Sequence, residues 1–227
     1  VAASYSYMTY ERNDIWQDSQ TLWEDTLAKY PDSSPANVNL SAIYLEQRRF
    51  RDVQELCLAA IKAKPYDYLA ISNLALAQVM MKQYDNAINN YKQALKLKSD
   101  LPKSEMGLAM AYWGKGDYEN AYLLYSQLLR EGKVPGPESL GTYFYRIGFS
   151  LWKLNRTEQA MEYLTRAEEL ARDNPFLLKD MGMAYNSMGD FVRAAQMFEE
   201  AIPKLQEGEL KTKLNAILGL LKEKHGF

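Results

Sequence analysis

The stretch "GDYENAYLLYSQLL" (residues 116–129) recurs at residues 189–202 as "GDFVRAAQMFEEAI". Both copies place Gly-Asp, an aromatic residue, an alanine and a second aromatic residue at the same spacings. Three more copies start at Arg48, Lys82 and Asn155, so the intervals between successive starts are 34, 34, 39 and 34 residues. A period of this length predicts stacked units, each of which packs on its neighbours.

The composition excludes several classes of function. The chain has 227 residues and is 47% hydrophobic and 25% charged, which is ordinary for a globular protein. Its formal net charge is −2 and it has no basic stripe, so we do not expect nucleic acid as a partner. Its single cysteine excludes an internal disulfide. Because no apolar run approaches about 18 residues, we expect no direct membrane insertion of this segment.

Each unit has the pattern of two packed helices. In the first half, apolar or small residues follow the spacing i, i+1, i+4, which lies on one face of a helix. These residues are Leu40, Ser41 and Tyr44, then Leu108, Ala109 and Tyr112, then Met181, Gly182 and Tyr185. In the second half a small residue lets the helices approach and a large one fills the gap to the next unit. These positions hold Val53, Cys57 and Ala60; Ala87, Tyr91 and Ala94; Ala121, Tyr125 and Leu128; Ala160, Leu164 and Ala167; and Ala194, Phe198 and Ala201.

Breaks in the pattern predict turns and loops. Gly116, Asn155 and Gly189 suit the left-handed conformation that ends a helix, whereas Arg48 and Lys82 suit it less well. Pro203 is expected to shorten or kink the last repeat helix. Residues 130–140 contain two prolines and two glycines, which predicts a loop without helix. The alternative is a change of superhelical direction at that point.

The pattern resembles the tetratricopeptide repeat (TPR) family. The matching residues are Leu108, Ala109, Tyr112, Ala121 and Tyr125 in one unit, and Met181, Gly182, Tyr185, Ala194, Phe198 and Ala201 in another. Gln78 and Thr157 depart from it, since each stands where the family has an aromatic residue. The resemblance implies an all-α fold, a right-handed α-solenoid of helix-turn-helix repeats.

The register divides the chain into seven segments. They are residues 1–33 (an N-terminal segment with a half-repeat helix), 34–67, 68–101, 102–140 (with an extended loop), 141–174, 175–206 and 207–227 (a C-terminal capping helix). The last segment carries an apolar stripe, which consists of Leu210, Leu214, Ile217, Leu218 and Leu221. A stack of repeats needs such an end to close its core.

The sequence has no pattern of catalytic or metal-binding residues, and we expect neither an enzyme nor a cofactor. His225 lies in the C-terminal tail, where we expect it to be solvated, and Cys57 occupies a core position, where we expect inert packing. Asn155, Arg156 and Thr157 form a glycosylation acceptor triplet, which has meaning only in the right compartment.

The resemblance implies that the first helix of each unit contributes to a concave groove. We expect a peptide-binding groove lined by Leu76, Met106, Met110, Trp113, Tyr145, Phe149, Trp152, Phe176, Lys179 and Met183. So apolar a surface is typical of an interaction site, and we expect a peptide or a partner protein. The alternative is that these side chains are buried against one another or covered by the capping helix. Only Asn73 and Lys103 match the five-residue clamp by which some family members bind a peptide carboxylate, so an apolar peptide is favoured.

Two further hypotheses concern the parent protein. Residues 9–33 resemble the segment that follows the last membrane helix in polytopic glycosyltransferase-like proteins of the O-mannosyltransferase type with C-terminal tetratricopeptide repeats. That resemblance favours an extracytoplasmic domain, periplasmic or at the cell surface. Alternatively, Trp16 and Trp23 near an uncapped end favour a self-associating scaffold.

Overall fold

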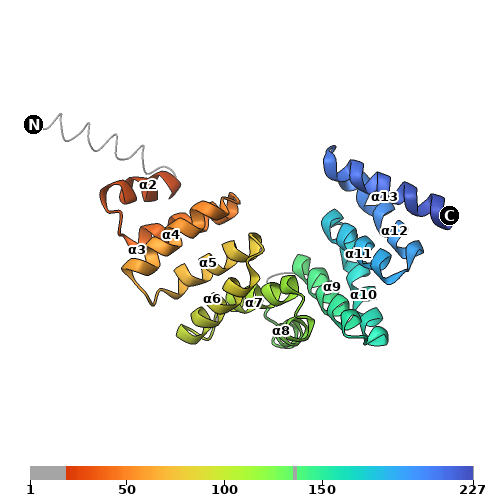
Figure 1. The fold of residues 1–227 in the computed structure, drawn as a ribbon, viewed down its shortest axis with the longest axis horizontal. Helices are drawn as coiled ribbons and strands as arrows, with labels where there is room; N and C mark the ends of the chain where they lie inside the picture. The colour runs from red at the N-terminus through yellow and green to blue at the C-terminus, as the bar shows by residue number, and fades with distance from the viewer. Residues whose placement is uncertain (1–18, 135–136, 227) are drawn as a thin grey trace, which may run out of the picture. The chain divides into compact units, whose positions relative to one another are not determined.

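A computed structural model describes residues 19–134 and 137–226 of the chain. Every regular element in these residues is a helix, and consecutive helices form helix-turn-helix repeats (Figure 1). The prediction of an all-α repeat fold is therefore confirmed. The chain divides into two compact units. Unit 1 ends at Asp117, and unit 2 begins at Tyr118.

Unit 1 contains the first six described helices. They are α2 (Ser19–Lys29), α3 (Ser34–Glu46), α4 (Phe50–Ala63), α5 (Tyr68–Met80), α6 (Tyr84–Leu97) and α7 (Pro102–Lys115). Helix α3 packs on α4 and helix α5 on α6, so each pair is one repeat. The first helices of successive repeats also contact one another, α3 with α5 and α5 with α7.

Unit 2 follows the same plan. Its elements are α8 (Tyr118–Arg130), α9 (Pro137–Lys153), α10 (Thr157–Ala171), α11 (Pro175–Met188), α12 (Phe191–Ala201), the 3₁₀ turn η1 (Ile202–Lys204) and α13 (Glu209–His225). Helix α9 packs on α10 and helix α11 on α12, and α9 also contacts α11. Helix α13 closes the unit by packing on α12 and η1.

The core lies where the repeat register predicts it. All fifteen second-helix positions named above, from Val53 to Ala201, have side chains at most 2% exposed. Burial of these apolar positions within each unit is the main source of stability in a stack of repeats. Gln78, one departure from the family pattern, is also buried, and its side-chain oxygen accepts a hydrogen bond of 2.8 Å from Asn90.

Two glycines mark the closest approach of paired helices. A Cβ atom on Gly182 would lie 2.5 Å from Cε1 of Phe198, and one on Gly148 would lie 2.8 Å from Cγ of Leu164 and 3.0 Å from the carbonyl oxygen of Ala160. Real Cβ atoms do not approach other atoms so closely, so the paired helices require glycine at these crossings.

The turn inside each repeat uses one left-handed residue, whatever its side chain. The five turn residues all have positive φ: 60° at Arg48, 62° at Lys82, 86° at Gly116, 60° at Asn155 and 83° at Gly189. The left-handed conformation costs a residue with a Cβ about 1 kcal/mol or more. Closure of the turn therefore outweighs the preference of Arg48 and Lys82 for negative φ.

One prediction about the loops is wrong in part and another is confirmed. Residues 137–140 belong to helix α9, whereas the sequence predicted no helix there. Proline is well accepted in the first turn of a helix, where its missing N–H has no intrahelical partner to lose. Helix α12 has 11 residues, against 13 to 15 in α4, α6, α8 and α10, and Pro203 lies in the 3₁₀ turn that follows it.

We predict opposite effects of alanine at two helical glycines. Gly182→Ala is expected to lower the free energy of unfolding by about 1–2 kcal/mol, because overpacking against Phe198 outweighs the better helix propensity of alanine. Gly219→Ala in α13 is expected to raise it by about 0.5–1 kcal/mol, because nothing lies within 4 Å of the added Cβ. Denaturant unfolding followed by circular dichroism measures both, and changes of the same sign would contradict the assigned packing.

We also predict that Lys82→Gly stabilises the chain by about 0.5–1 kcal/mol, because glycine adopts positive φ without strain. The reverse change, Gly116→Lys at the equivalent turn, is the matched control and is expected to destabilise by a similar amount. Thermal unfolding of the two variants and the parent chain gives the comparison. No gain from Lys82→Gly would mean that the lysine side chain contributes more than its backbone strain costs.

Candidate functional site

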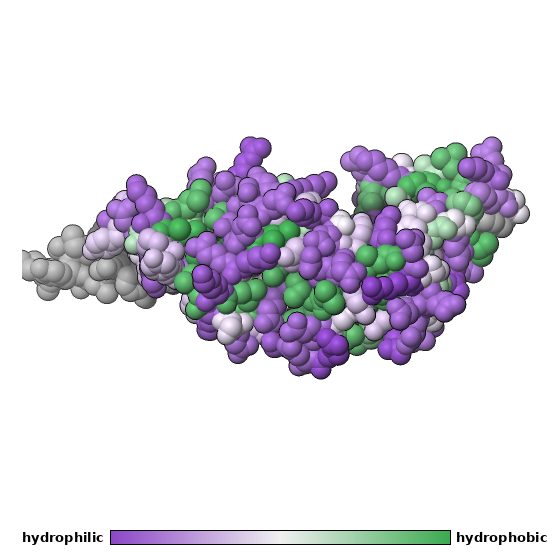
Figure 2. Space-filling model, turned by 60° about the horizontal axis from the view of Figure 1, so that its bottom comes forward, coloured by the Kyte–Doolittle hydropathy of each residue, from purple (hydrophilic) through white to green (hydrophobic). Residues whose placement is uncertain are grey.

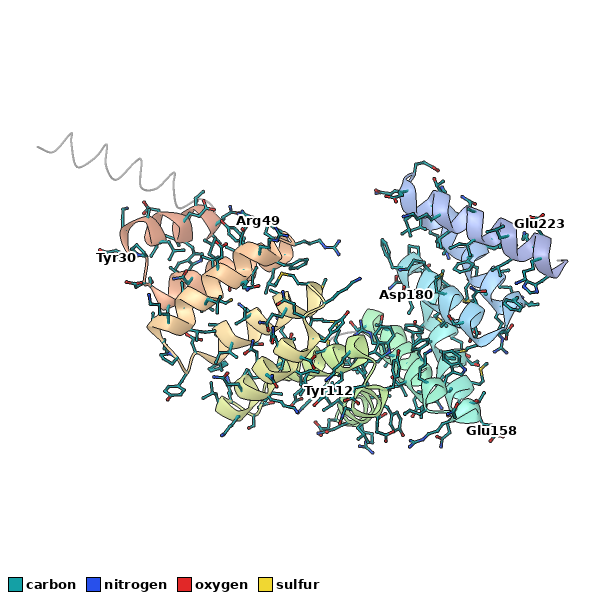
Figure 3. The ribbon with its side chains drawn as sticks, in the orientation of Figure 1. Tyr30, Arg49, Tyr112, Glu158, Asp180 and Glu223 are labelled. Carbon is teal, nitrogen blue, oxygen red and sulfur yellow. The ribbon has the colours of Figure 1, made fainter. Side chains whose placement is uncertain are left out.

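The first helices of unit 2, α9 and α11, contact each other and carry six of the ten residues predicted to line a groove. The hydroxyl of Tyr145 on α9 donates a hydrogen bond of 3.3 Å to the carbonyl oxygen of Asp180 on α11 (labelled in Figure 3). Tyr145 is only 5% exposed. It therefore fixes the spacing of the two helices from beneath and offers a partner little surface of its own.

An aromatic cluster extends along α9 from Tyr145. The ring of Phe149 lies 5.9 Å from that of Tyr145 and 5.4 Å from that of Trp152, measured between centroids. Tyr118, at the start of α8, meets the other edge of Phe149 at 5.8 Å in an edge-to-face contact. Phe149 and Trp152 are half-buried. They form a firm aromatic surface, because each ring is held by its neighbours.

A single lysine completes this cluster. The Nζ atom of Lys153 lies 4.3 Å from the ring centroid of Trp152 and 5.4 Å from that of Phe149. Both distances are within the range of a cation–π interaction. Lys153 is exposed and makes no ion pair within the described residues. Its charge is thus held at the edge of the aromatic surface and stays available.

Helix α11 adds exposed apolar side chains to the same face. Phe176 is 60% exposed and Met183 is 44% exposed. The side chain of Asn174 caps the helix by accepting hydrogen bonds of 3.1 Å and 3.0 Å from the backbone N–H groups of Phe176 and Leu177, which fixes where α11 begins. Lys179 is paired with Asp180 at 2.6 Å, so its charge is already compensated.

The corresponding face of unit 1 is less aromatic. Leu76 on α5 and Met106, Met110 and Trp113 on α7 are half-buried, and Leu69 at the start of α5 is exposed. Short hydrogen bonds join the helices here: Ser72 and Ser104 share one of 2.8 Å, and Asn73 donates one of 2.9 Å to Ser41.

The ten residues predicted to line a groove all lie on first helices. Four are on α5 and α7 of unit 1, and six are on α9 and α11 of unit 2. Ring contacts join Tyr145, Phe149 and Trp152, and the groove itself stays a prediction. Apolar side chains reach the surface among polar ones in the view of Figure 2. Helix α13 packs on α12 and η1, the second-helix side of the last repeat. The carboxylate clamp gains no support, because the amide of Asn73 is committed to Ser41.

Two residues of the aromatic cluster were missed by the sequence reasoning. Tyr118 was identified only as the aromatic residue that begins the second helix of its repeat, and it was not predicted to lie at the groove. Lys153 was not considered, although it directly follows Trp152 and lies four residues after Phe149, which places it beside both on a helix. The spacing alone was therefore enough to find Lys153.

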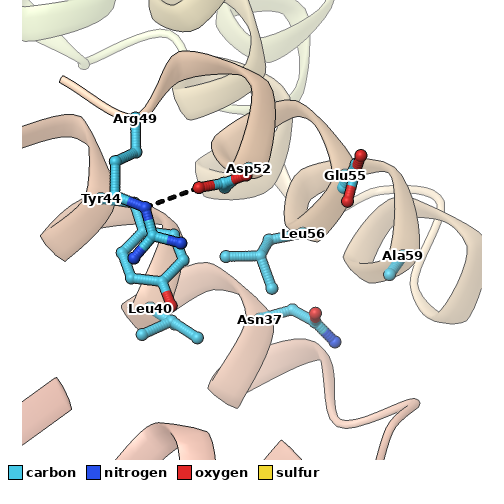
Figure 4. Close-up of a pocket in the computed structure, with 8 residues that line it drawn as sticks. All are labelled: Asn37, Leu40, Tyr44, Arg49, Asp52, Glu55, Leu56 and Ala59. Atoms are coloured by element: carbon cyan, nitrogen blue, oxygen red, sulfur yellow. Dashed lines mark hydrogen bonds and ion pairs between the residues drawn. The ribbon is translucent and has the colours of Figure 1, made fainter.

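A pocket of about 390 Å³ lies between α3 and α4 of unit 1 (Figure 4). Its lining consists of Asn37, Leu40, Tyr44, Arg49, Asp52, Glu55, Leu56 and Ala59. The Arg49 guanidinium lies 3.7 Å from the ring centroid of Tyr44, and its Nε atom lies 2.6 Å from Oδ2 of Asp52. Arginine and aspartate thus pair with each other in this pocket, and neither charge is left for a ligand.

Cys57 and His225 both pack against other side chains and have no sign of a catalytic role. Burial raises the pKa of the Cys57 thiol to about 11, so it is protonated at neutral pH and inert. His225 is half-buried and stacks on Phe191 at 3.8 Å between ring centroids, so the expectation of a solvated tail is wrong.

Within residues 19–134 and 137–226, no three His, Cys, Asp or Glu side chains gather as a metal site would require. The described helices also include none that combines the length and apolarity of a membrane span.

Part of the sequence reasoning falls outside the described residues. Trp16 and residues 9–18 of the segment that resembles a membrane glycosyltransferase-like protein precede Ser19. Trp23 is described, and it packs on the core cluster around Leu40 and Tyr44. Self-association through these tryptophans and the membrane-protein context both stay predictions.

Known sequences carry the same repeats. A family model described as TPR repeat matches residues 79–116, and one described as tetratricopeptide repeat matches residues 141–174. Tetratricopeptide repeat protein 8 of Caenorhabditis elegans is 25% identical over 170 residues. The match covers 74% of this chain and 32% of the relative, so the chain spans about a third of that relative's length. The tetratricopeptide repeats expected from the sequence are confirmed.

Solved structures show the same fold at low identity. A tetratricopeptide repeat protein from Parabacteroides merdae has a TM-score of 0.66 at 13% identity, covering 93% of this chain and 80% of its own. A thermophilic TPR protein in Thermus thermophilus has a TM-score of 0.63 at 20% identity, with coverages of 83% and 98%. YrrB, described as a TPR protein with an unusual peptide-binding site, has a TM-score of 0.57 at 12% identity, with coverages of 86% and 97%.

Buried tyrosines next to this face make the stability of unit 2 depend on pH. Burial raises the pKa values of Tyr125, Tyr143, Tyr145 and Tyr185, that of Tyr143 to about 12. Tyr125 accepts a hydrogen bond from Arg146, and Tyr185 donates one to Glu168. The hydroxyl of Tyr143 is buried and has no hydrogen-bond partner among the described residues.

We predict that Tyr143→Phe is neutral or stabilising by up to about 1 kcal/mol at pH 7, because it removes a buried hydroxyl that lacks a partner. In the unfolded chain this tyrosine loses its proton near pH 10, whereas in the folded chain it keeps the proton until about pH 12. Below pH 10 Tyr143 is protonated in both states and does not make the stability depend on pH. Between pH 10 and 12 it ionises only in the unfolded chain, so the free energy of unfolding falls as the pH rises. The variant should lose stability less steeply over that range.

Urea unfolding at several pH values between 7 and 12 measures this effect. Tyr185→Phe is the control, because it removes the hydrogen bond from the Tyr185 hydroxyl to Glu168 and should destabilise the chain by about 1–2 kcal/mol at pH 7. A marked loss of stability in Tyr143→Phe at neutral pH would show that its hydroxyl is satisfied after all.

Proposed function

We propose that this chain of tetratricopeptide repeats is a non-catalytic interaction module in which the face formed by α9 and α11 binds an apolar segment of a protein or peptide. The fold is one that generally serves protein–protein interaction. The observation that carries the proposal is the exposure of Phe176 and Met183 on α11, the helix that contacts α9 with its half-buried Phe149 and Trp152.

The energetics of such a face favour binding. Complete burial of a phenylalanine or methionine side chain is worth about 1.5–3 kcal/mol relative to leaving it in water. Much of this free energy of burial is still available to a partner at Phe176 and Met183, because a large part of each side chain is exposed in the free chain. Phe149 and Trp152 are already ordered by ring contacts, so they contribute area with little loss of conformational entropy. Methionine adapts its shape to different apolar partners.

Unit 1 is proposed to add a second, weaker contact through Leu76, Met106, Met110 and Trp113. These side chains are half-buried, and the serine and asparagine hydrogen bonds beneath them tie the helices together. Such a surface suits aliphatic side chains of a partner, whereas the aromatic face of unit 2 suits the principal anchor.

We predict that Phe176→Ser combined with Met183→Ser abolishes capture of a partner from native extract, with the chain as bait. Both side chains are substantially exposed, so the variant should keep its helical signal and its unfolding temperature. The matched control is Leu123→Ser combined with Val192→Ser on the second helices α8 and α12, where the side chains are 52% and 54% exposed. Both variants remove two exposed apolar side chains.

The comparison between the two variants decides the outcome. A partner that is retained by the control and lost by Phe176→Ser with Met183→Ser supports the face of α9 and α11 as the binding surface. Equal retention by both variants, or loss only in the control, overturns the proposal and moves the interaction to the second-helix side.

A further inference from the structure

The charges around the aromatic cluster are not balanced. The face of α9 and α11 carries two lysines, the exposed Lys153 and the partly buried Lys179, and Asp180 as its carboxylate among the described side chains. Arg146 of α9 instead donates a hydrogen bond to Tyr125 of α8. Lys179 is neutralised by Asp180 at 2.6 Å. One uncompensated positive charge remains, at Lys153, although the chain as a whole has a formal net charge of −2.

The position of this charge is fixed by the rings beneath it. The Nζ atom of Lys153 lies 4.3 Å from the centroid of Trp152, closer than its 5.4 Å to Phe149, so the ammonium is held at the Trp152 end of the cluster. A side chain that contacts an aromatic face gives up part of its hydration and part of its rotamer freedom in advance. The ammonium is therefore prepared for an anion that arrives with an apolar group.

A cation bordering an apolar surface selects for an acidic group next to an apolar anchor. When a ligand covers Trp152 and Phe149 it excludes water from around Lys153, and a charge pair gains strength as the local dielectric constant falls. A basic group at the same point would suffer repulsion and desolvation without compensation. An uncharged ligand would leave the ammonium partly desolvated and unpaired.

We infer that the partner is an acidic amphipathic segment, in which an aromatic or aliphatic anchor that packs on Phe149 and Trp152 is followed or preceded within about one helical turn by an aspartate or glutamate that pairs with Lys153. This inference rests on the proposed function, because it names the chemistry that the same face recognises. It differs from the carboxylate clamp of the family, since neither Asn73 nor Lys103 takes part.

The test is selection from a random twelve-residue peptide library displayed on phage, with the complete chain as the target. Selections run in parallel on the parent chain, on Lys153→Gln and on Lys224→Gln. Lys224 is the matched control, because it is an exposed lysine near the end of helix α13, away from the aromatic cluster. Selected peptides are synthesised, and their dissociation constants are measured by calorimetry at low and high salt.

The expected result has three parts. Peptides from the parent chain combine an apolar anchor with a nearby Asp or Glu; Lys153→Gln weakens their binding by about three- to fivefold, the size expected for a partly exposed charge pair; and Lys224→Gln leaves it unchanged. Their affinity also falls as the salt concentration rises. Replacing the acidic residue of a selected peptide with glutamine should weaken binding to the parent chain and have no effect on Lys153→Gln, because the pair is already broken.

Two other outcomes are distinguishable. Peptides that depend on Phe176 and Met183 but show no acidic preference, or bind Lys153→Gln equally well, overturn the acidic partner and leave the proposed function intact. Peptides that bind the Phe176→Ser with Met183→Ser variant as tightly as the parent chain overturn the proposed function, and the acidic partner with it.

Discussion

The two helices of a repeat cross so closely that the rest of the structure depends on what occupies the crossing point. Gly148 and Gly182 leave no room for a methyl group against Leu164 and Phe198. Ser41 and Ala75 hold the equivalent positions in the two helix pairs of unit 1, and both are fully buried. This spacing sets how far a first helix stands above its partner. It thereby determines which first-helix residues reach the surface and which, like Tyr145, stay beneath it.

The repeat period made most of the fold predictable from the sequence. Once the register was found, the buried positions of five second helices followed, because a residue's place in the repeat determines its neighbours. Less predictable were features in which the backbone competes with local preference. Arg48 and Lys82 adopt the left-handed conformation because the turn must close, and Pro137 starts a helix although proline usually signals an interruption. In both cases tertiary packing decides between alternatives that the sequence leaves open.

The candidate site was predictable in its composition and less so in its geometry. Helical spacing placed the ten predicted residues on first helices, yet it did not distinguish the buried Tyr145 from the exposed Phe176. It also did not reveal that the side chains of Asn73 and Lys179 are engaged by Ser41 and Asp180. Such pairings depend on which helix lies beside which, and on side-chain rotamers. That Lys153 keeps an unpaired charge is therefore known only from the structure, which shows how the neighbouring charged and polar side chains are paired.

The three left-handed turn residues that carry a Cβ have a consequence for the evolution of the binding face. Each adopts a strained backbone conformation in the turn between the two helices of a repeat and is not one of the residues proposed to bind the partner. A lineage that replaces such a residue by glycine gains a margin of stability of about 1 kcal/mol per site. That margin allows exposed apolar residues to change identity, since a moderately destabilising exchange on the face no longer unfolds the stack. The turns thus act as a reserve of mutational tolerance, from which new partner specificity can arise without any change in architecture.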